Sequence, residues 1–215
     1  MPDPVGLFEM RRLEALSNTI FGVAMTLLAY DLPKLSGVAS APNWADIYQA
    51  YAQHVSALML SFIIAGMFWF SHQRRLVTAP EAARGTVFLN LIFLLSIIVL
   101  PATNGLLGTY GSSSGVVAVI YGVHLTVIAA LNALLWLIAV KGRRRWEILA
   151  LAIFPFVMFL LGTAIAVVAP PVAPFLWYLG FLAPLIGRLG RGRPLLHQSN
   201  PDMRQSRKFG SRPPD

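Results

Sequence analysis

Six stretches of the chain are long and apolar enough to cross a lipid bilayer, and they constrain the fold more than any other feature. A helix needs about 20 apolar residues to span roughly 30 Å of hydrocarbon. The stretches cover about 13–32, 44–70, 86–107, 116–140, 148–169 and 172–187. The last is the shortest and contains Pro174 and Pro184, which leaves five spans as the alternative. We expect an all-α integral membrane protein with six transmembrane helices.

The composition agrees with this expectation and argues against a soluble enzyme. Hydrophobic residues make up 56% of the 215 residues and charged residues only 12%, about half the charged share of soluble domains. No cysteine is present, which excludes disulfides, thiolate metal sites and cysteine nucleophiles. The spans contain no paired carboxylates, no histidine cluster at metal-ligand spacing and no glycine-rich phosphate loop. We therefore expect neither enzymatic activity, a cofactor nor a bound metal.

The basic residues set the expected topology. The chain carries a net charge of +8, and all of its 17 Lys and Arg residues except Lys34 fall on one side of a six-span bundle. These residues lie at 11–12, 74–84, 141–145 and 188–212. By the positive-inside rule, both termini are cytoplasmic. The positive charge thus indicates a multi-pass protein of the cell inner (plasma) membrane, without nucleic acid as a partner.

Two parts follow from this reading of the chain. We expect residues 1–187 to form the six-helix transmembrane domain. Residues 188–215 are polar and rich in Arg and Pro, a composition that cannot bury enough apolar surface to fold. They are expected to form a disordered cytoplasmic tail, which either binds anionic lipid head groups or simply keeps positive charge inside.

Polar residues are costly inside a membrane, so the few present here are informative. They gather near the cytoplasmic ends of the first three spans, and because the second span runs opposite to the other two, they lie at similar depth. We expect one hydrogen-bonded cluster that joins the three helices. Structural support is the favoured role, ahead of contact with a permeating ion. The members are Arg12, Glu14, Ser17, Asn18, Trp69, His72 and Asn90.

The first span also carries an apolar stripe. Val23, Leu27 and Tyr30 follow one another at i, i+4 and i+7, with Thr26 beside them. The stripe lies roughly 120–140° around the helix from Ser17 and Asn18, so the two faces meet different partners. Such a stripe is usually ordinary packing. If the chain oligomerises about this helix, the same stripe lines a narrow apolar pore.

Two further readings stay open. His54 in the second span and His124 in the fourth are suitable residues for a proton relay, which would make the chain a small secondary or proton-coupled transporter. Alternatively, the chain is a non-conducting membrane scaffold whose Arg-rich tail binds a partner.

Three segments resemble the prokaryotic branch of the lysosomal potassium channel family, transmembrane protein 175. The segment Arg12-Leu-Glu-Ala-Leu16-Ser17-Asn18 is similar to its first-helix signature, which is Arg, three residues, then Phe-Ser-Asp. Trp69-Phe-Ser-His72 resembles the Trp-x-x-His of its second helix. The stretch from Leu89-Asn90 onward resembles its third helix. The resemblance covers residues 11–108, about half of the chain.

This resemblance implies a homotetrameric, potassium-preferring cation channel with the first helices around the axis. Val23 would form an apolar constriction, with Thr26 and Leu27 above it and Tyr30 nearest the outside. No Thr-Val-Gly-Tyr-Gly loop is present, so backbone carbonyls of that kind do not select the ion. The departures are Leu16 in place of Phe and Asn18 in place of Asp, and Asn keeps the hydrogen-bonding shape without the charge.

Overall fold

The computed structural model describes residues 4–34, 42–78, 84–140 and 145–180, and within these ranges the chain is helical, without a β-strand. The expectation of an all-α protein is confirmed to this extent. The helices are α1 (Pro4–Leu27), α2 (Trp44–Thr78), α3 (Arg84–Tyr110), α4 (Gly115–Ala139), α5 (Arg145–Val168), the short 3₁₀ helix η2 (Pro170–Val172) and α6 (Ala173–Leu179).

Four of these helices have both the length and the composition to cross a membrane. They comprise the residues Trp44–Val77, Gly85–Tyr110, Gly115–Ala139 and Ile148–Val168, which are the second to fifth predicted spans. The 24 residues of α1 reach about 36 Å, but its charged residues and Asn18 make it less apolar than the other four. Of the predicted sixth span, α6 is described up to Leu179. Residues 181–187 and the predicted tail lie outside the described residues.

Three helix ends differ from the prediction. The first span was expected to run to about residue 32, but α1 ends at Leu27 and a turn follows it. The second span was expected to end near residue 70, but α2 continues to Thr78. Arg74 and Arg75 therefore belong to the helix and not to a loop. The prediction was wrong because hydropathy falls at a charged residue whether or not the helix ends there. At the other end of the chain, α1 begins at Pro4, where the fixed φ of proline suits a first helical turn.

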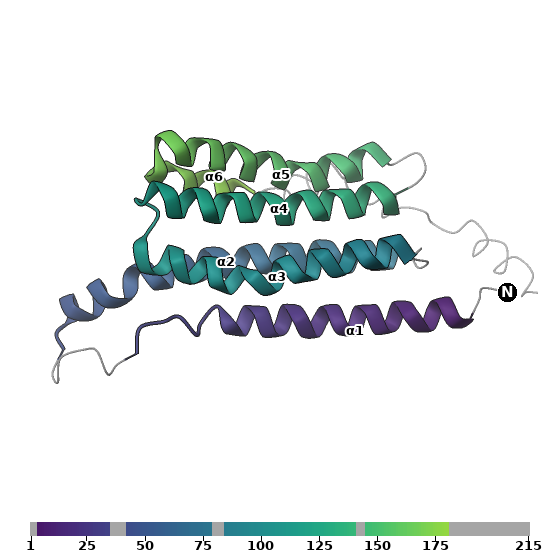
Figure 1. Ribbon diagram of the computed structural model, residues 1–215, viewed down its shortest axis with the longest axis horizontal. Helices are drawn as coiled ribbons and strands as arrows, with labels where there is room; N and C mark the ends of the chain where they lie inside the picture. Colours follow the sequence, from purple (N-terminus) through teal and green to yellow (C-terminus); the bar gives the residue numbers. More distant parts are fainter. Residues whose placement is uncertain (1–3, 35–41, 79–83, 141–144, 181–215) are drawn as a thin grey trace, which may run out of the picture.

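The long helices lie side by side along the longest axis of the molecule (Figure 1). At one edge α1 packs against α2 and α3, α3 packs against α4, and α4 packs against α5. The short α6 contacts α5. The pore-helix candidate is thus an edge helix, held by two neighbours and lying away from α4 and α5 (Figure 1).

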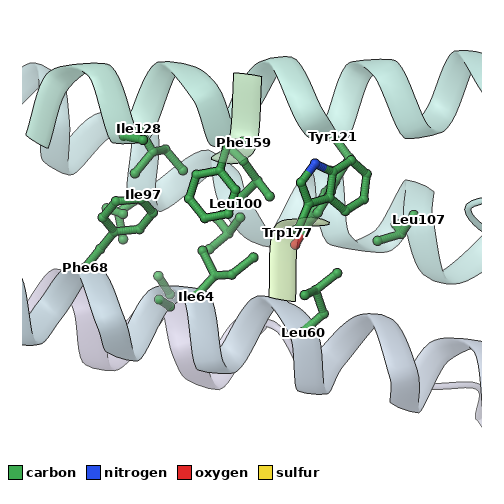
Figure 2. Close-up of a cluster of buried hydrophobic side chains, with 14 of the residues drawn as sticks. Leu60, Ile64, Phe68, Ile97, Leu100, Leu107, Tyr121, Ile128, Phe159 and Trp177 are labelled. Carbon is green, nitrogen blue, oxygen red and sulfur yellow. The ribbon is translucent and has the colours of Figure 1, made fainter. Parts of the chain in front are cut away.

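One apolar core joins α1 to α6, and Figure 2 shows a part of it. Phe68 of α2 contacts Phe159 of α5 at a centroid distance of 6.0 Å, and the ring of Tyr121 in α4 lies 5.1 Å from that of Trp177 in α6. Phe21 and Ala24 bring α1 into this core. Its labelled members are Leu60, Ile64, Phe68, Ile97, Leu100, Leu107, Tyr121, Ile128, Phe159 and Trp177.

Candidate pore helix and its anchors

One face of α1 is buried against the bundle. Buried side chains recur along it every three or four residues, which is the spacing of one helical face. The stripe ties α1 to its neighbours through apolar packing, with one hydroxyl among the side chains. Its members are Leu13, Ser17, Phe21, Ala24 and Leu28.

The opposite face of α1 is not covered by the described chain. Val23 is 54% exposed and Leu27 44%, and Thr26 beside them is also exposed. Tyr30 is 71% exposed, but it lies in the turn that follows α1 and not on the helical face where it was expected. The Thr26 hydroxyl donates to the carbonyl of Gly22 within the same helix, so its proton is already used. The predicted stripe is therefore an unpartnered apolar surface with the hydroxyl oxygen of Thr26 at its edge.

The first anchor of α1 is Asn18. Its Oδ1 accepts a hydrogen bond from Trp69 Nε1 at 2.9 Å and a second from Gln73 Nε2. Trp69 and Gln73 lie four residues apart on α2, and one carbonyl oxygen with two lone pairs satisfies both donors. This contact joins α1 to α2.

A second polar group lies between α2 and α3. Arg75 Nη2 donates to Asn90 Oδ1 at 2.6 Å and to His72 Nδ1 at 2.7 Å. Because a guanidinium has no acceptor, His72 Nδ1 must accept, and the proton of the neutral ring is on Nε2. The His72 ring stacks on Phe93 of α3 at 5.6 Å and lies 6.0 Å from Phe21 of α1. All three helices therefore meet at this imidazole.

The structure divides the expected polar cluster into these two groups. Ser17 is buried and donates to the Leu13 carbonyl of its own helix at 2.7 Å, so it bonds to neither group. Arg12 and Glu14 are exposed, and so is Leu16, on the side of the apolar stripe.

Sequence reasoning missed two of the anchoring residues, Gln73 and Arg75. Arg75 lies three residues after His72 and hence on the same helical face. This spacing is the available signal, but Arg75 lies beyond the expected end of the second span near residue 70.

A third network fixes the other end of α1. Ser61 Oγ donates to Asn104 Oδ1 at 2.8 Å and lies 2.8 Å from the Tyr121 hydroxyl, which donates to it. Asn104 Nδ2 in turn donates to the carbonyl of Leu28 at 3.4 Å. This network connects the last turn of α1 to α2, α3 and α4.

The two histidines proposed for a proton relay differ in their surroundings. His124 Nε2 donates to the Ser96 carbonyl at 3.0 Å, and Nδ1 lies 2.8 Å from Thr103 Oγ1. His54 packs against Gly108, at which an added Cβ would lie 3.1 Å from the His54 ring. Within the described ranges no hydrogen bond joins the two rings, and no three His, Cys, Asp or Glu residues are grouped as metal ligands.

The chain matches a protein-family model described as the endosomal/lysosomal potassium channel TMEM175, over residues 12–101. That range contains most of α1, all of α2 and most of α3. The matched region therefore contains both anchors and the exposed stripe.

Two curated relatives are similar to the chain. A potassium channel of Streptomyces collinus is 29% identical over 134 residues, which are 60% of this chain and 64% of that protein. The match thus spans just under two thirds of the Streptomyces channel. A potassium channel of a Chryseobacterium species is 25% identical over 182 residues, or 81% of this chain and 92% of that protein.

The fold is that of a solved bacterial structure. The crystal structure of a lysosomal potassium-selective channel TMEM175 homologue from Chamaesiphon minutus is similar with a TM-score of 0.75 at 21% identity, covering 83% of this chain and 98% of that one. The likeness extends over α4 and α5, beyond the range of the family model. Taken together, these matches make the chain similar to the prokaryotic branch of the TMEM175 family.

Proposed function

We propose that the chain is the subunit of a homotetrameric, potassium-preferring cation channel of the cell inner membrane. Four copies of α1 surround the axis, and the residues that line the pore are Val23, Thr26, Leu27 and Tyr30. The permeant ion is K⁺, and no cofactor takes part. The similar Streptomyces and Chryseobacterium proteins are both named as potassium channels.

The observation that carries this proposal is the uncovered face of α1. The helix is long enough to span a bilayer but less apolar than α2 to α5. A helix of this composition is not expected to face lipid on all the sides that α2 and α3 leave uncovered. Its packed face is occupied by α2 and α3. The free stripe with Val23 and Leu27 is therefore available to neighbouring copies and to the pore.

An apolar ring at Val23 can gate by dewetting, since water leaves a narrow hydrophobic constriction readily. An ion passes such a ring only if it sheds part of its hydration shell. Potassium costs less to dehydrate than sodium, which yields a moderate potassium preference without a carbonyl filter.

A proton-coupled carrier is the weaker function for this chain. Both ring nitrogens of His124 already have neighbours on α3, at Ser96 and Thr103. A relay would need to break these contacts in each cycle. The lining of a pore by α1 requires no such rearrangement.

The test is potassium flux, with sodium as comparison, into liposomes that contain the purified full chain. Leu27→Ala should widen the constriction and raise flux about three- to tenfold, equivalent to a barrier lower by about 0.7–1.4 kcal/mol. Leu160→Ala on α5 is the matched control, because Leu160 is 47% exposed and Leu27 44%. It should leave flux unchanged.

Unchanged flux and selectivity in Leu27→Ala would remove this face of α1 from the pore. Proton flux that depends on His124 would favour the carrier. If folded protein conducts neither potassium nor sodium, the result would favour the non-conducting membrane scaffold.

A further inference from the structure

Lys34 is the one basic residue on the side of the membrane that the topology predicts to be outside. The segments that connect the predicted spans on that side contain three charged residues, which are Asp31, Lys34 and Asp46. All the other Lys and Arg residues of the sequence fall on the opposite side. Where charges are so few, each one contributes strongly to the local electrostatic potential.

The structure places Lys34 beside the turn that follows α1. Its Nζ lies 5.6 Å from the centroid of the Tyr30 ring, which is the range of a cation–π contact. The backbone that carries Lys34 is fixed to the bundle, because the Tyr51 hydroxyl of α2 donates to the carbonyl of Pro33 at 2.7 Å. The ammonium is thus held next to Tyr30, the proposed pore-lining residue nearest the outside.

The two carboxylates on this side have different neighbours. Asp31 lies against α3, since a Cβ added at Gly105 would be 2.5 Å from Asp31 Oδ2. Asp46 lies in the first turn of α2, where its Oδ2 accepts from the backbone N–H of Asn43 at 2.9 Å. These contacts place the positive charge, and not a carboxylate, at the Tyr30 ring.

We propose that Lys34 is a fixed positive charge at the outer mouth of the pore and that it lowers the rate at which cations enter from outside. The inference rests on the proposed function, in which four copies of Tyr30 surround the axis. A cation that touches the Tyr30 ring comes within about 10 Å of Lys34 Nζ, which is one Debye length at 0.1 M salt. Repulsion acts over that distance at low salt, whereas at 1 M the screening length of about 3 Å removes it.

A contact with Tyr30 that serves only to hold the turn predicts a different result. A cation–π contact requires the ammonium against the ring. Repulsion of an entering ion requires only a positive charge at position 34, whatever group carries it. A charge attached chemically at this position therefore separates the two roles.

The experiment records single-channel potassium conductance of the full chain in a planar bilayer, at about 20 mM and at about 1 M potassium chloride. Because the chain has no cysteine, Lys34→Cys carries one thiol for impermeant methanethiosulfonate reagents. Lys34→Cys should raise the inward conductance about two- to fivefold at low salt and leave it unchanged at 1 M. A reagent that attaches trimethylammonium should restore the unaltered level, and one that attaches sulfonate should raise the conductance further.

Ser113→Cys is the control, because Ser113 is exposed in the turn between α3 and α4, on the same predicted side but apart from α1 (Figure 1). Neither reagent should alter its conductance. Equal conductance in every state of Lys34→Cys, in a chain that conducts potassium, would overturn this inference alone. An equal effect at Ser113→Cys would also overturn it, as would a change that persists at 1 M salt. An unaltered chain that does not conduct would overturn the proposed function and this inference with it.

Discussion

At the scale of single residues, the position that distinguishes this chain is Asn18. The family signature has a carboxylate there, and the amide retains the geometry because its Oδ1 accepts from both Trp69 and Gln73. The difference lies in strength, since hydrogen bonds to a carboxylate are roughly twice as strong as those between neutral groups. Asn18 thus keeps the α1–α2 contact in a weaker form.

Asn18→Asp and Asn18→Leu should change the thermal stability of the chain in opposite directions. Asn18→Asp keeps both contacts and strengthens them, which should raise the unfolding midpoint by about 2 °C. Asn18→Leu removes them and should cost about 1–2 kcal/mol. Thermal unfolding in detergent measures both.

Thr19→Val is the control for this pair, because the Thr19 hydroxyl donates only to Ala15 of its own helix. It should change the midpoint little. If Asn18→Leu unfolds at the same temperature as the unaltered chain, the contact with Trp69 and Gln73 does not anchor α1.

The sequence pointed to several polar residues that the structure places between helices, and their role in anchoring α1 stays a prediction. Trp69, His72, Asn18 and Asn90 were named, and each has a contact between helices. Which of these residues hydrogen-bond to one another depends on side-chain rotamers and on neighbouring helices. The spacing of residues along the sequence gives neither.

At the scale of helices, α6 is held at two glycines of its neighbours. A Cβ at Gly162 of α5 would lie 2.5 Å from Trp177 Nε1, and one at Gly122 of α4 would lie 3.0 Å from the Trp177 ring. The absent side chains make room for the largest buried residue of the core. Close approach to glycine is a familiar way to pack membrane helices.

Gly162→Ala should displace Trp177 and destabilise the fold by about 1–3 kcal/mol, the usual cost of overpacking a core. Gly85→Ala in α3 is the control, since nothing lies within 4 Å of an added Cβ there. Unfolding midpoints and the near-UV signal of tryptophan report the effect. Equal stability of the two variants would show that α6 does not depend on this contact.

The cores of the helices were predictable and their ends less so. The start of α2 at Trp44 and the bounds of α4 agree with the prediction to within one residue. Asn43 caps the start of α2. Gly111, with a φ of 75°, ends the helical conformation between α3 and α4. The end of α2 was missed because Arg75 is held by hydrogen bonds to His72 of the same helix and to Asn90 of α3, and hydropathy does not detect such contacts.

At the scale of the whole molecule, the topology is a prediction from charge. The turn at Ser113 between α3 and α4 and the exposed Val77 near the end of α2 should lie on opposite sides of the membrane. As the chain has no cysteine, Ser113→Cys and Val77→Cys each carry one thiol. An impermeant maleimide applied to intact cells should label only Ser113→Cys, and labelling of Val77→Cys alone would invert the orientation.

The proposed tetramer predicts a mass of about four times the 23.5 kDa chain by light scattering with the detergent contribution subtracted. Association should depend on α1, because its apolar stripe is the face left uncovered on that helix. Val23→Asp places a charge in the stripe and should weaken assembly or conduction. A monomeric unaltered chain would remove the central pore.

The measurement that tests the account most directly is block of potassium flux by Ag⁺, an ion close to K⁺ in size that binds thiolates. In a chain without native cysteine, Val23→Cys places the only thiol at the proposed constriction, and Leu160→Cys places it on the exposed side of α5. The account predicts that Ag⁺ stops flux through Val23→Cys and spares Leu160→Cys and the unaltered chain. Full flux through Val23→Cys in Ag⁺, with the thiol shown to be reactive in unfolded protein, would contradict a pore lined by α1.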